Sequence, residues 1–298
     1  YSVTGVQTCA LPISLDAYRK KITACLPESL DFIPLMSFKL LAGMDAKTVE
    51  TCAAAGAVAG KYYPAGATTN AADGPSNPGA VSEALSAMES AGVVLSIHGE
   101  DPDAPSLERE AAFLPALEKI LDRWPRLRIV LEHLSTREAV DFVAKGPERL
   151  AATITAHHLL FTIDDMMGAG LNPHLFCKPP IKSAADRRAL RNAAFSGSPK
   201  FFFGSDSAPH ARAAKESARA PGGVYSSPTA IPALLGLFES EGALEALKPF
   251  VASSGARFYR LPAPQGRLRL LREPWTVPGE IDGIVPMCAG SELAWRLA

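Results

Sequence analysis

The feature that most constrains this chain is a regular alternation of short apolar runs with helix-like segments. Helix-like segments, with apolar residues three or four apart, cover residues 14–27, 45–55, 77–91 and 106–123. Apolar runs near turn residues are typical of buried parallel strands, and they cover residues 33–41, 56–63, 93–100, 128–135, 150–157 and 200–207. The alternation predicts a (β/α) barrel or a doubly wound sheet, with six strands where a closed barrel has eight.

Composition limits the functions that such a chain can have. With 298 residues, 47% of them apolar and 20% charged, the chain is expected to form one large α/β domain. A formal net charge of −1 argues against nucleic acid or anionic lipid as a partner and favours a small molecule. No apolar stretch reaches the ~20 residues of a membrane span. The five scattered cysteines lack CxxC spacing, which predicts a reducing, cytoplasmic location.

Four polar residues stand at the ends of the predicted strands. Lys61 ends the second run, His98 the third, His133 the fourth and Asp206 the sixth. In a (β/α) barrel the carboxyl ends of the strands meet at one rim, where catalytic groups gather. Imidazole and carboxylate are common zinc ligands. The sequence therefore predicts a metal site at this rim.

Each of these residues also has a structural interpretation. A lone histidine at a strand end is more often a hydrogen-bonded structural residue. Asp206 is suitable as the N-cap of the next segment. Lys61 has the alternative interpretation of a surface lysine at the start of a loop. Their coincidence at strand ends favours a shared site. Three further histidines are interpreted as structural: His157, His158 and His174. The stretch 216–223 is predicted to be a flexible loop.

Six stretches carry a family resemblance. They are "GKYYPAGATTN", "SIHGE", "LEHLST", "LAATITAHHLL", "PHLFCKPPIK" and "GSDSAPHARAAKES", in this order. With them the chain resembles the dihydroorotase family, the short bacterial type of the amidohydrolase superfamily. The resemblance implies a (β/α)8 TIM barrel of the metallo-dependent hydrolase type. It also implies zinc-dependent, reversible cyclisation of N-carbamoyl-L-aspartate to L-dihydroorotate in de novo pyrimidine (UMP) biosynthesis.

The resemblance also implies a binuclear zinc site. Lys61 matches a lysine that CO2 carboxylates and that then bridges two zinc ions. His98 and His133 match ligands of the second zinc, and Asp206 matches a ligand of the first that also moves the proton between water and the ring nitrogen. Metal ligation without proton transfer stays open for Asp206. A carbamate suits this position because an ammonium, with a pKa near ~10.4, would repel two cations.

The same resemblance assigns the binding of substrate. The implied contact positions are His98, Lys178, His210, Gly222, Thr68 and Thr69. Gly222 is expected to contact the substrate through its backbone N–H, and Lys178 through its main chain, at a position where the family often has leucine. Thr68 and Thr69 match a pair on a mobile loop that closes over the substrate.

The sequence departs from the family pattern at the start of the chain. The family's first strands carry an HxH pair, an arginine and an asparagine, and no HxH occurs in these 298 residues. Residues 1–13 resemble translated sequencing-adapter DNA, so we expect that they are not native, with an ordinary disordered N-terminal tail as the alternative. Together with the missing motifs, this predicts that 14–298 form a partial barrel domain without its first two strands. This predicts poor binding of the first zinc and little activity for the chain as given.

Two alternatives remain open on the sequence. One is a hydantoinase-like or allantoinase-like enzyme, which acts on a related cyclic amide. The other is a non-catalytic homologue that acts as a binding partner of another enzyme. The "YPAGATTN" and "SDSAPH" stretches argue against the first, and the retention of all four predicted ligands argues against the second. A homodimer is compatible with the resemblance.

Overall fold

The computed structural model describes residues 12–27, 30, 32–68, 71–263 and 265–298. Its contacts divide the chain into two compact units. The N-terminal unit comprises the described residues up to 104 together with 112–131, and the C-terminal unit comprises 105–111 and 132–298. The expected non-native segment 1–13 lies almost entirely outside the described residues.

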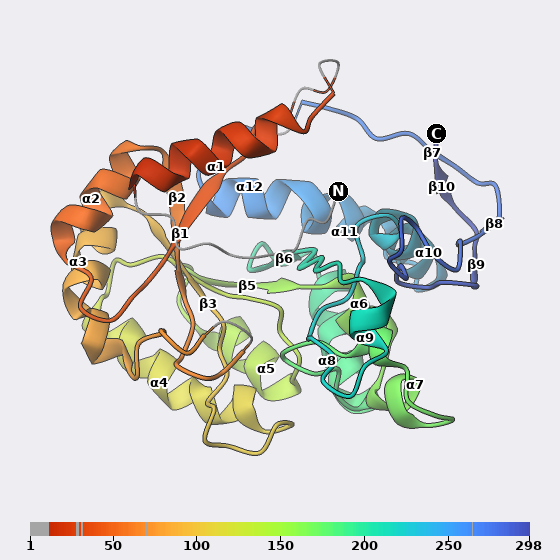
Figure 1. The fold of residues 1–298 in the computed structure, drawn as a ribbon, viewed down its shortest axis with the longest axis horizontal. Helices are drawn as coiled ribbons and strands as arrows, with labels where there is room; N and C mark the ends of the chain where they lie inside the picture. The colour runs from red at the N-terminus through yellow and green to blue at the C-terminus, as the bar shows by residue number, and fades with distance from the viewer. Residues whose placement is uncertain (1–11, 28–29, 31, 69–70, 264) are drawn as a thin grey trace. The chain divides into compact units, whose positions relative to one another are not determined.

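Parallel strands form the centre of the N-terminal unit (Figure 1). In chain order they are β1 (Met36–Lys39), β2 (Ala57–Tyr62), β3 (Val94–Ile97) and β4 (Ile129–Leu131), and each pairs with the next. Each lies within a run predicted from the sequence. Side chains on both faces of β3 are buried, as expected for a parallel strand covered on two sides.

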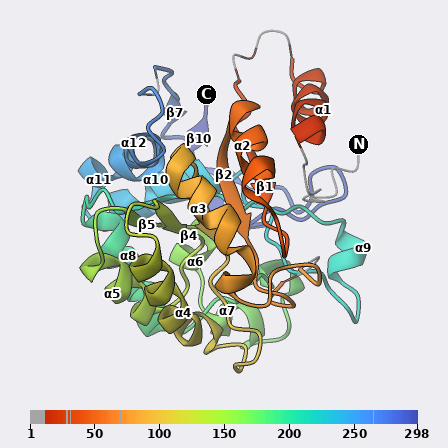
Figure 2. The same ribbon diagram turned by 90° about the vertical axis from the view of Figure 1, so that its left-hand side faces the viewer.

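Helices cover these strands, and their ends follow local chemistry. They are α1 (Pro12–Ala24), α2 (Ala46–Ala54), α3 (Ser82–Ala91), which the short η1 (Pro78–Val81) precedes, and α4 (Arg109–Arg123). Asp45 caps α2 by accepting a hydrogen bond from the Thr48 N–H at 2.8 Å. Gly92 ends α3 in the left-handed conformation. Figure 2 shows α2 and α3 beside β1 and β2.

Close packing beneath β2 explains the glycine that precedes Lys61. A Cβ atom on Gly60 would lie 2.8 Å from Met88 Cε and 2.9 Å from Phe38 Cζ. Both of these neighbours are fully or almost fully buried. The small residue therefore lets the end of β2 lie directly against the core, which fixes the direction of the strand just before the lysine.

The C-terminal unit contains the remaining strands of the predicted set, β5 (Leu150–Ile154) and β6 (Phe201–Phe203), which pair in parallel. Its longer helices are α5 (Arg137–Lys145), α8 (Ala184–Phe195) and α10 (Ala230–Ser240). Short helical segments are α6 (Ala156–Leu160), α7 (Ile163–Met167), η2 (Pro173–Leu175), α9 (Arg212–Lys215), α11 (Leu244–Lys248), η3 (Pro249–Ser253) and α12 (Ser254–Phe258).

Aromatic packing joins the helices of this unit to β6. The ring of Phe238 in α10 lies 4.7 Å from that of Phe195 in α8 and 5.6 Å from that of Phe250 in η3. Phe202 in β6 contacts Phe258 of α12, with ring centroids 5.9 Å apart. These pairs bury large apolar areas and hold the strand that leads into Asp206.

The end of the chain forms two small antiparallel pairs that the sequence did not predict. β7 (Leu270–Leu271) pairs with β10 (Arg296–Leu297), and β8 (Trp275–Thr276) pairs with β9 (Glu292–Leu293). Strands of two residues carry too little periodicity to be recognised in a sequence. Among the described residues, no helix is long and apolar enough to cross a membrane.

Candidate metal and substrate site

Lys61 lies at the end of β2 and is buried. Its side chain is 8% exposed, and its Nζ atom lies 4.8 Å from the centroid of the Tyr63 ring. In the strand register Lys61 is opposite Ser96 on β3, two residues before His98. The structure therefore places this predicted ligand as a buried residue at the end of β2.

His98 follows β3 and lies beside the end of β2. Its N–H donates to the Tyr62 carbonyl at 2.9 Å, and its ring centroid lies 5.8 Å from that of Tyr63. Tyr63 is therefore close to both Lys61 and His98, so the structure brings these two predicted ligands together within the N-terminal unit.

A buried carboxylate orients the His98 ring. Glu100 Oε2 lies 2.8 Å from His98 Nε2, and both side chains are 2% exposed. The contact is a hydrogen bond between Nε2 and the carboxyl group, and it holds the ring in one orientation. Histidines that ligate metals commonly donate their other ring N–H to a carboxylate in this way. Sequence reasoning did not assign Glu100, although it stands two residues after His98 in the "SIHGE" stretch.

His133 and Asp206 share an unusual backbone conformation in the C-terminal unit. Their φ angles are 46° and 39°, in the left-handed region that residues other than glycine rarely adopt. Such a conformation costs of order 1–3 kcal/mol and is often retained at functional sites. The strain therefore supports a functional interpretation of both residues.

Thr153 on β5 connects the two strained positions. Its hydroxyl accepts a hydrogen bond from the His133 N–H at 2.7 Å. A Cβ atom on Gly204, two residues before Asp206, would lie 2.8 Å from Thr153 Cβ. The segments that carry His133 and Asp206 thus both pack on the same threonine. His133 is buried, whereas Asp206 is exposed.

Three predicted substrate contacts come together in the C-terminal unit. His210 Nε2 lies 3.3 Å from the Gly222 carbonyl oxygen. A Cβ atom on Gly222 would lie 3.4 Å from Lys178 Cγ and 3.6 Å from its backbone nitrogen. Desolvation lowers the pKa of His210, which keeps the ring neutral near pH 7.

The segment after Asp206 pairs with the segment after Gly222, since the Ala208 N–H donates to the Val224 carbonyl at 3.0 Å. Ser207 and Val224 form a parallel bridge there. The structure therefore places Asp206 in the neighbourhood of the three substrate positions. Of the two loop threonines, Thr68 is half-buried and Thr69 lies outside the described residues.

Glu110 is a second buried acid that sequence reasoning missed. It accepts hydrogen bonds from the N–H groups of Ser135 and Thr136, and from the Thr136 hydroxyl. Thr136, three residues after His133, in turn caps α5. Desolvation raises the pKa of Glu110 to about 7, although the nearby positive charge of Lys182 acts to lower it. Its position directly after "SLER" (106–109) shows no sequence pattern that would reveal this role.

The loop predicted to be flexible, 216–223, is contacted by a buried lysine. Lys215, which is 2% exposed, donates from its Nζ atom to the carbonyl oxygens of Pro221 and Gly223 at 3.0 and 2.8 Å. A lysine next to a glycine-rich loop gave no hint of this arrangement, because the acceptors are backbone atoms. These contacts tie down the C-terminal end of the loop, and its flexibility stays a prediction.

Three buried side chains elsewhere lie close enough to suggest a metal site: the donor atoms of His157, His158 and Cys177 lie within 4.8 Å of one another. His158 already uses both nitrogens, with Thr155 Oγ1 at 2.8 Å and the Pro179 carbonyl at 3.2 Å. The Cys177 thiol donates to the same carbonyl. Desolvation lowers the pKa of both histidines and raises that of Cys177 to about 12. These groups are therefore uncharged near pH 7. Both ring nitrogens of His157 are buried without a hydrogen-bond partner, so the structural interpretation of the two histidines stays a prediction.

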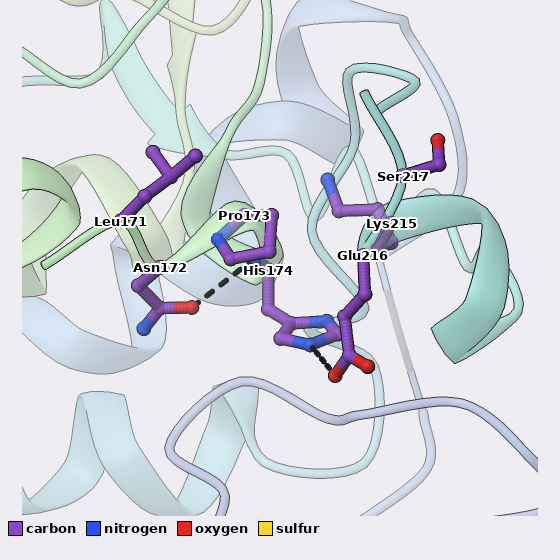
Figure 3. Close-up of a pocket in the computed structure, with 7 residues that line it drawn as sticks. All are labelled: Leu171, Asn172, Pro173, His174, Lys215, Glu216 and Ser217. Atoms are coloured by element: carbon purple, nitrogen blue, oxygen red, sulfur yellow. Dashed lines mark hydrogen bonds and ion pairs between the residues drawn. The ribbon is translucent and has the colours of Figure 1, made fainter. Parts of the chain in front are cut away.

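His174 also has a structural role. Its Nε2 atom lies 3.1 Å from Glu216 Oε1, and the two side chains line an open pocket together with Leu171 and Lys215 (Figure 3). The pair ties the segment around η2 to the segment after α9. This agrees with the structural interpretation of His174.

Comparison with known proteins finds amidohydrolases and dihydroorotases among the similar proteins. A family model described as amidohydrolase matches residues 41–155. The dihydroorotase of Teredinibacter turnerae is 44% identical over 288 residues, which cover 94% of this chain and 84% of that protein. The crystal structure of dihydroorotase from Saccharomyces cerevisiae in complex with 5-fluoroorotic acid has a TM-score of 0.90 at 36% identity, over 97% of this chain and 86% of that one.

A second solved structure, dihydroorotase from Campylobacter jejuni, has a TM-score of 0.86 at 36% identity. The matched region covers 96% of this chain and 83% of the Campylobacter jejuni chain. The likeness spans nearly all of the sequence, so the barrel-type α/β fold predicted from the strand and helix pattern is confirmed.

Proposed function

The chain belongs to the dihydroorotase family, and on this basis we propose that it interconverts N-carbamoyl-L-aspartate and L-dihydroorotate in de novo pyrimidine biosynthesis. The observation that carries the proposal is the arrangement at the ends of β2 and β3. There a buried lysine and a carboxylate-oriented histidine lie on neighbouring strands around Tyr63. This arrangement is suited to metal-assisted hydrolysis of an amide.

The residues fit a pair of zinc ions by the chemistry of their donors. Lys61 as a carbamate would bridge the ions, with His98 and His133 on one and Asp206 on the other. The contact between Glu100 and His98 supports this, since histidines that ligate metals commonly donate a ring N–H to a carboxylate. When bound, the ions polarise the ring carbonyl and make water nucleophilic near neutral pH. The number of ions and the carbamate are part of the proposal.

Asp206 has the central role in proton transfer. In hydrolysis, the oxygen of water bonds to the ring carbonyl carbon and the carbon–nitrogen bond of the ring breaks. The Asp206 carboxylate accepts the proton that water loses and delivers it to the departing nitrogen. In cyclisation the same proton moves in reverse, so one carboxylate serves both directions.

The C-terminal unit supplies the groups that hold the substrate. His210 contacts the substrate carboxylate, and the backbone N–H of Gly222 donates a hydrogen bond to the same group. The main chain at Lys178 contacts the pyrimidine ring. The close approach of Gly222 to Lys178 and His210 supports this grouping. Thr68 and Thr69 belong to the loop that closes over carbamoyl-aspartate.

A cytoplasmic location and a homodimer remain predictions. The location rests on the scattered cysteines of the sequence. Chemical cross-linking of dilute protein tests the dimer, and fractionation of the native host cells tests the location.

The proposal is tested by ligand choice. The chain is incubated with Zn²⁺ and bicarbonate, and calorimetry measures the binding of L-dihydroorotate and of hydantoin. Product formation from each is followed over long incubations. We expect binding and ring opening of dihydroorotate, both lost in Lys61→Ala. Preference for hydantoin, or no binding of dihydroorotate, would overturn the proposal.

A further inference from the structure

Lys215 has no part in the proposed metal and substrate contacts, yet it is among the most buried charged residues of the C-terminal unit, at 2% exposure. Its Nζ atom donates to three backbone carbonyls, those of Phe176 at 2.9 Å, Pro221 at 3.0 Å and Gly223 at 2.8 Å. An ammonium has three protons, so these three acceptors satisfy it completely.

The three acceptors lie beside the backbone groups proposed to bind substrate. Pro221 and Gly223 flank Gly222 on both sides, and Phe176 lies two residues before Lys178. One ammonium therefore connects two segments more than 40 residues apart in the chain. These segments carry the Gly222 N–H and the Lys178 main chain.

Further contacts hold the same two segments together. The Gly223 N–H donates to the Phe176 carbonyl at 2.9 Å, so this oxygen accepts from both Gly223 and Lys215. On the other side of the chain, Glu216 holds His174. Figure 3 shows that the Lys215 side chain points away from the pair of Glu216 and His174. The consecutive residues Lys215 and Glu216 therefore contact the segment around η2 at two different places, Phe176 and His174.

We propose that Lys215 is a positioning residue that holds the Gly222 N–H and the Lys178 main chain in the arrangement that binds substrate. This inference rests on the proposed function for its ligand, L-dihydroorotate. A neutral side chain at this position leaves three carbonyls without their donor, and the loop 216–223 then loses its fixed geometry. Affinity for the substrate falls as a result, because the loop must be ordered on binding.

The charge of Lys215 has few neighbours. Desolvation lowers its pKa to about 8, and Cys177, His157 and His210 are among the described groups that interact with it electrostatically. None of these carries a negative charge near pH 7, so the positive charge is held by backbone dipoles. A substitution at 215 therefore acts through the geometry of the backbone rather than by breaking an ion pair.

The chain contains a matched control. Lys200 also donates from Nζ to three backbone carbonyls, those of Val143, Ala144 and Gly146, at the end of α5. These acceptors are not next to any proposed substrate group. Lys200→Met therefore removes the same kind of interaction, with an expected loss of stability alone.

The experiment compares Lys215→Met, Lys215→Arg and Lys200→Met with the unchanged chain. Calorimetry gives the Kd for L-dihydroorotate with Zn²⁺ and bicarbonate present, thermal unfolding gives Tm, and hydrogen exchange reports the Gly223 N–H. We expect Lys215→Met to raise Kd about tenfold or more and to lose protection at Gly223. Lys200→Met lowers Tm but leaves Kd and Gly223 unchanged.

Lys215→Arg keeps the charge but presents a planar fork, so we expect partial rescue of Kd. If Lys215→Met does not fold, Lys215→Arg decides: a Kd and a Gly223 protection equal to those of the unchanged chain would overturn the inference. An equal Kd effect in Lys215→Met and Lys200→Met would also overturn it. Loss of Gly223 protection in Lys215→Met, when the unchanged chain does not bind dihydroorotate, supports the positioning role and overturns the proposed function alone.

Discussion

The two units contribute their predicted ligands in different ways. In the N-terminal unit, Lys61 and His98 lie on or directly after regular strands, both are buried, and side chains support them. In the C-terminal unit, His133 and Asp206 lie in strained left-handed conformations, and Asp206 is exposed. Side-chain partners fix the first pair, whereas backbone geometry fixes the second.

This difference shows which interactions each half of the site depends on. A ligand fixed by partners is sensitive to the loss of those partners, such as Glu100. A ligand fixed by a strained backbone carries a cost in stability that the rest of the fold must offset. The predictions below separate these two cases, beginning with the largest expected effect.

Removal of the Lys61 amine gives the largest effect. We expect Lys61→Ala to lose most of the zinc that the unchanged chain binds, because the proposed bridge disappears with its charge. Atomic absorption after gel filtration measures the bound zinc. Retention of full zinc content in Lys61→Ala would show that the N-terminal half of the site does not bind metal through this residue.

The buried carboxyl of Glu110 predicts a pH effect on the C-terminal unit. Its pKa is raised from 4.5 to about 7, so between these values the folded state holds a proton that the unfolded state has lost. The contribution of this group is therefore complete below pH 4.5 and is lost as the pH rises through 7. The free energy of unfolding should fall over this window by at most about 3 kcal/mol relative to Glu110→Gln.

Urea unfolding at several pH values measures this difference. Glu110→Gln removes the titration and keeps an amide oxygen as the acceptor for Ser135 and Thr136. Parallel pH curves for the two proteins would contradict the expected effect.

Loss of the Glu100 carboxylate tests whether the ligands of the N-terminal unit depend on their side-chain partners. We expect Glu100→Ala to weaken zinc binding by roughly 10- to 100-fold, because His98 loses the group that orients its ring. Glu118→Ala, in α4, is a control acid on the same unit. Titration with a competing zinc chelator gives both affinities, and equal affinities would remove Glu100 from the site.

The smallest expected effect is a change in stability when glycine replaces a ligand in the strained or in the regular backbone. Asp206→Gly should raise the free energy of unfolding by about 1 kcal/mol, because glycine adopts a φ of 39° without strain. His98→Gly should lower it, since that residue is not in the left-handed region and loses buried contacts. Chemical denaturation measures both. A loss of stability in Asp206→Gly would show that its backbone is not strained in solution.

The sequence predicted the strands that carry the site because buried parallel strands leave a continuous apolar pattern. The ends of those runs located Lys61, His98, His133 and Asp206 at or directly after strands. Glu100 and Lys215 escaped prediction because their roles depend on partners brought close only by folding: a histidine ring in one case and three backbone carbonyls in the other. The left-handed backbone of His133 and Asp206 also has no signal in residue type.

The central claim is that a CO2-modified Lys61 holds metal together with His98, His133 and Asp206. The most direct measurement is a ¹³C NMR spectrum of the chain equilibrated with ¹³C-bicarbonate and Zn²⁺. The account predicts a carbamate resonance that requires zinc and disappears in Lys61→Ala but remains in Lys47→Ala, a lysine on α2. A spectrum without such a resonance, or one that is unchanged in Lys61→Ala, would contradict it.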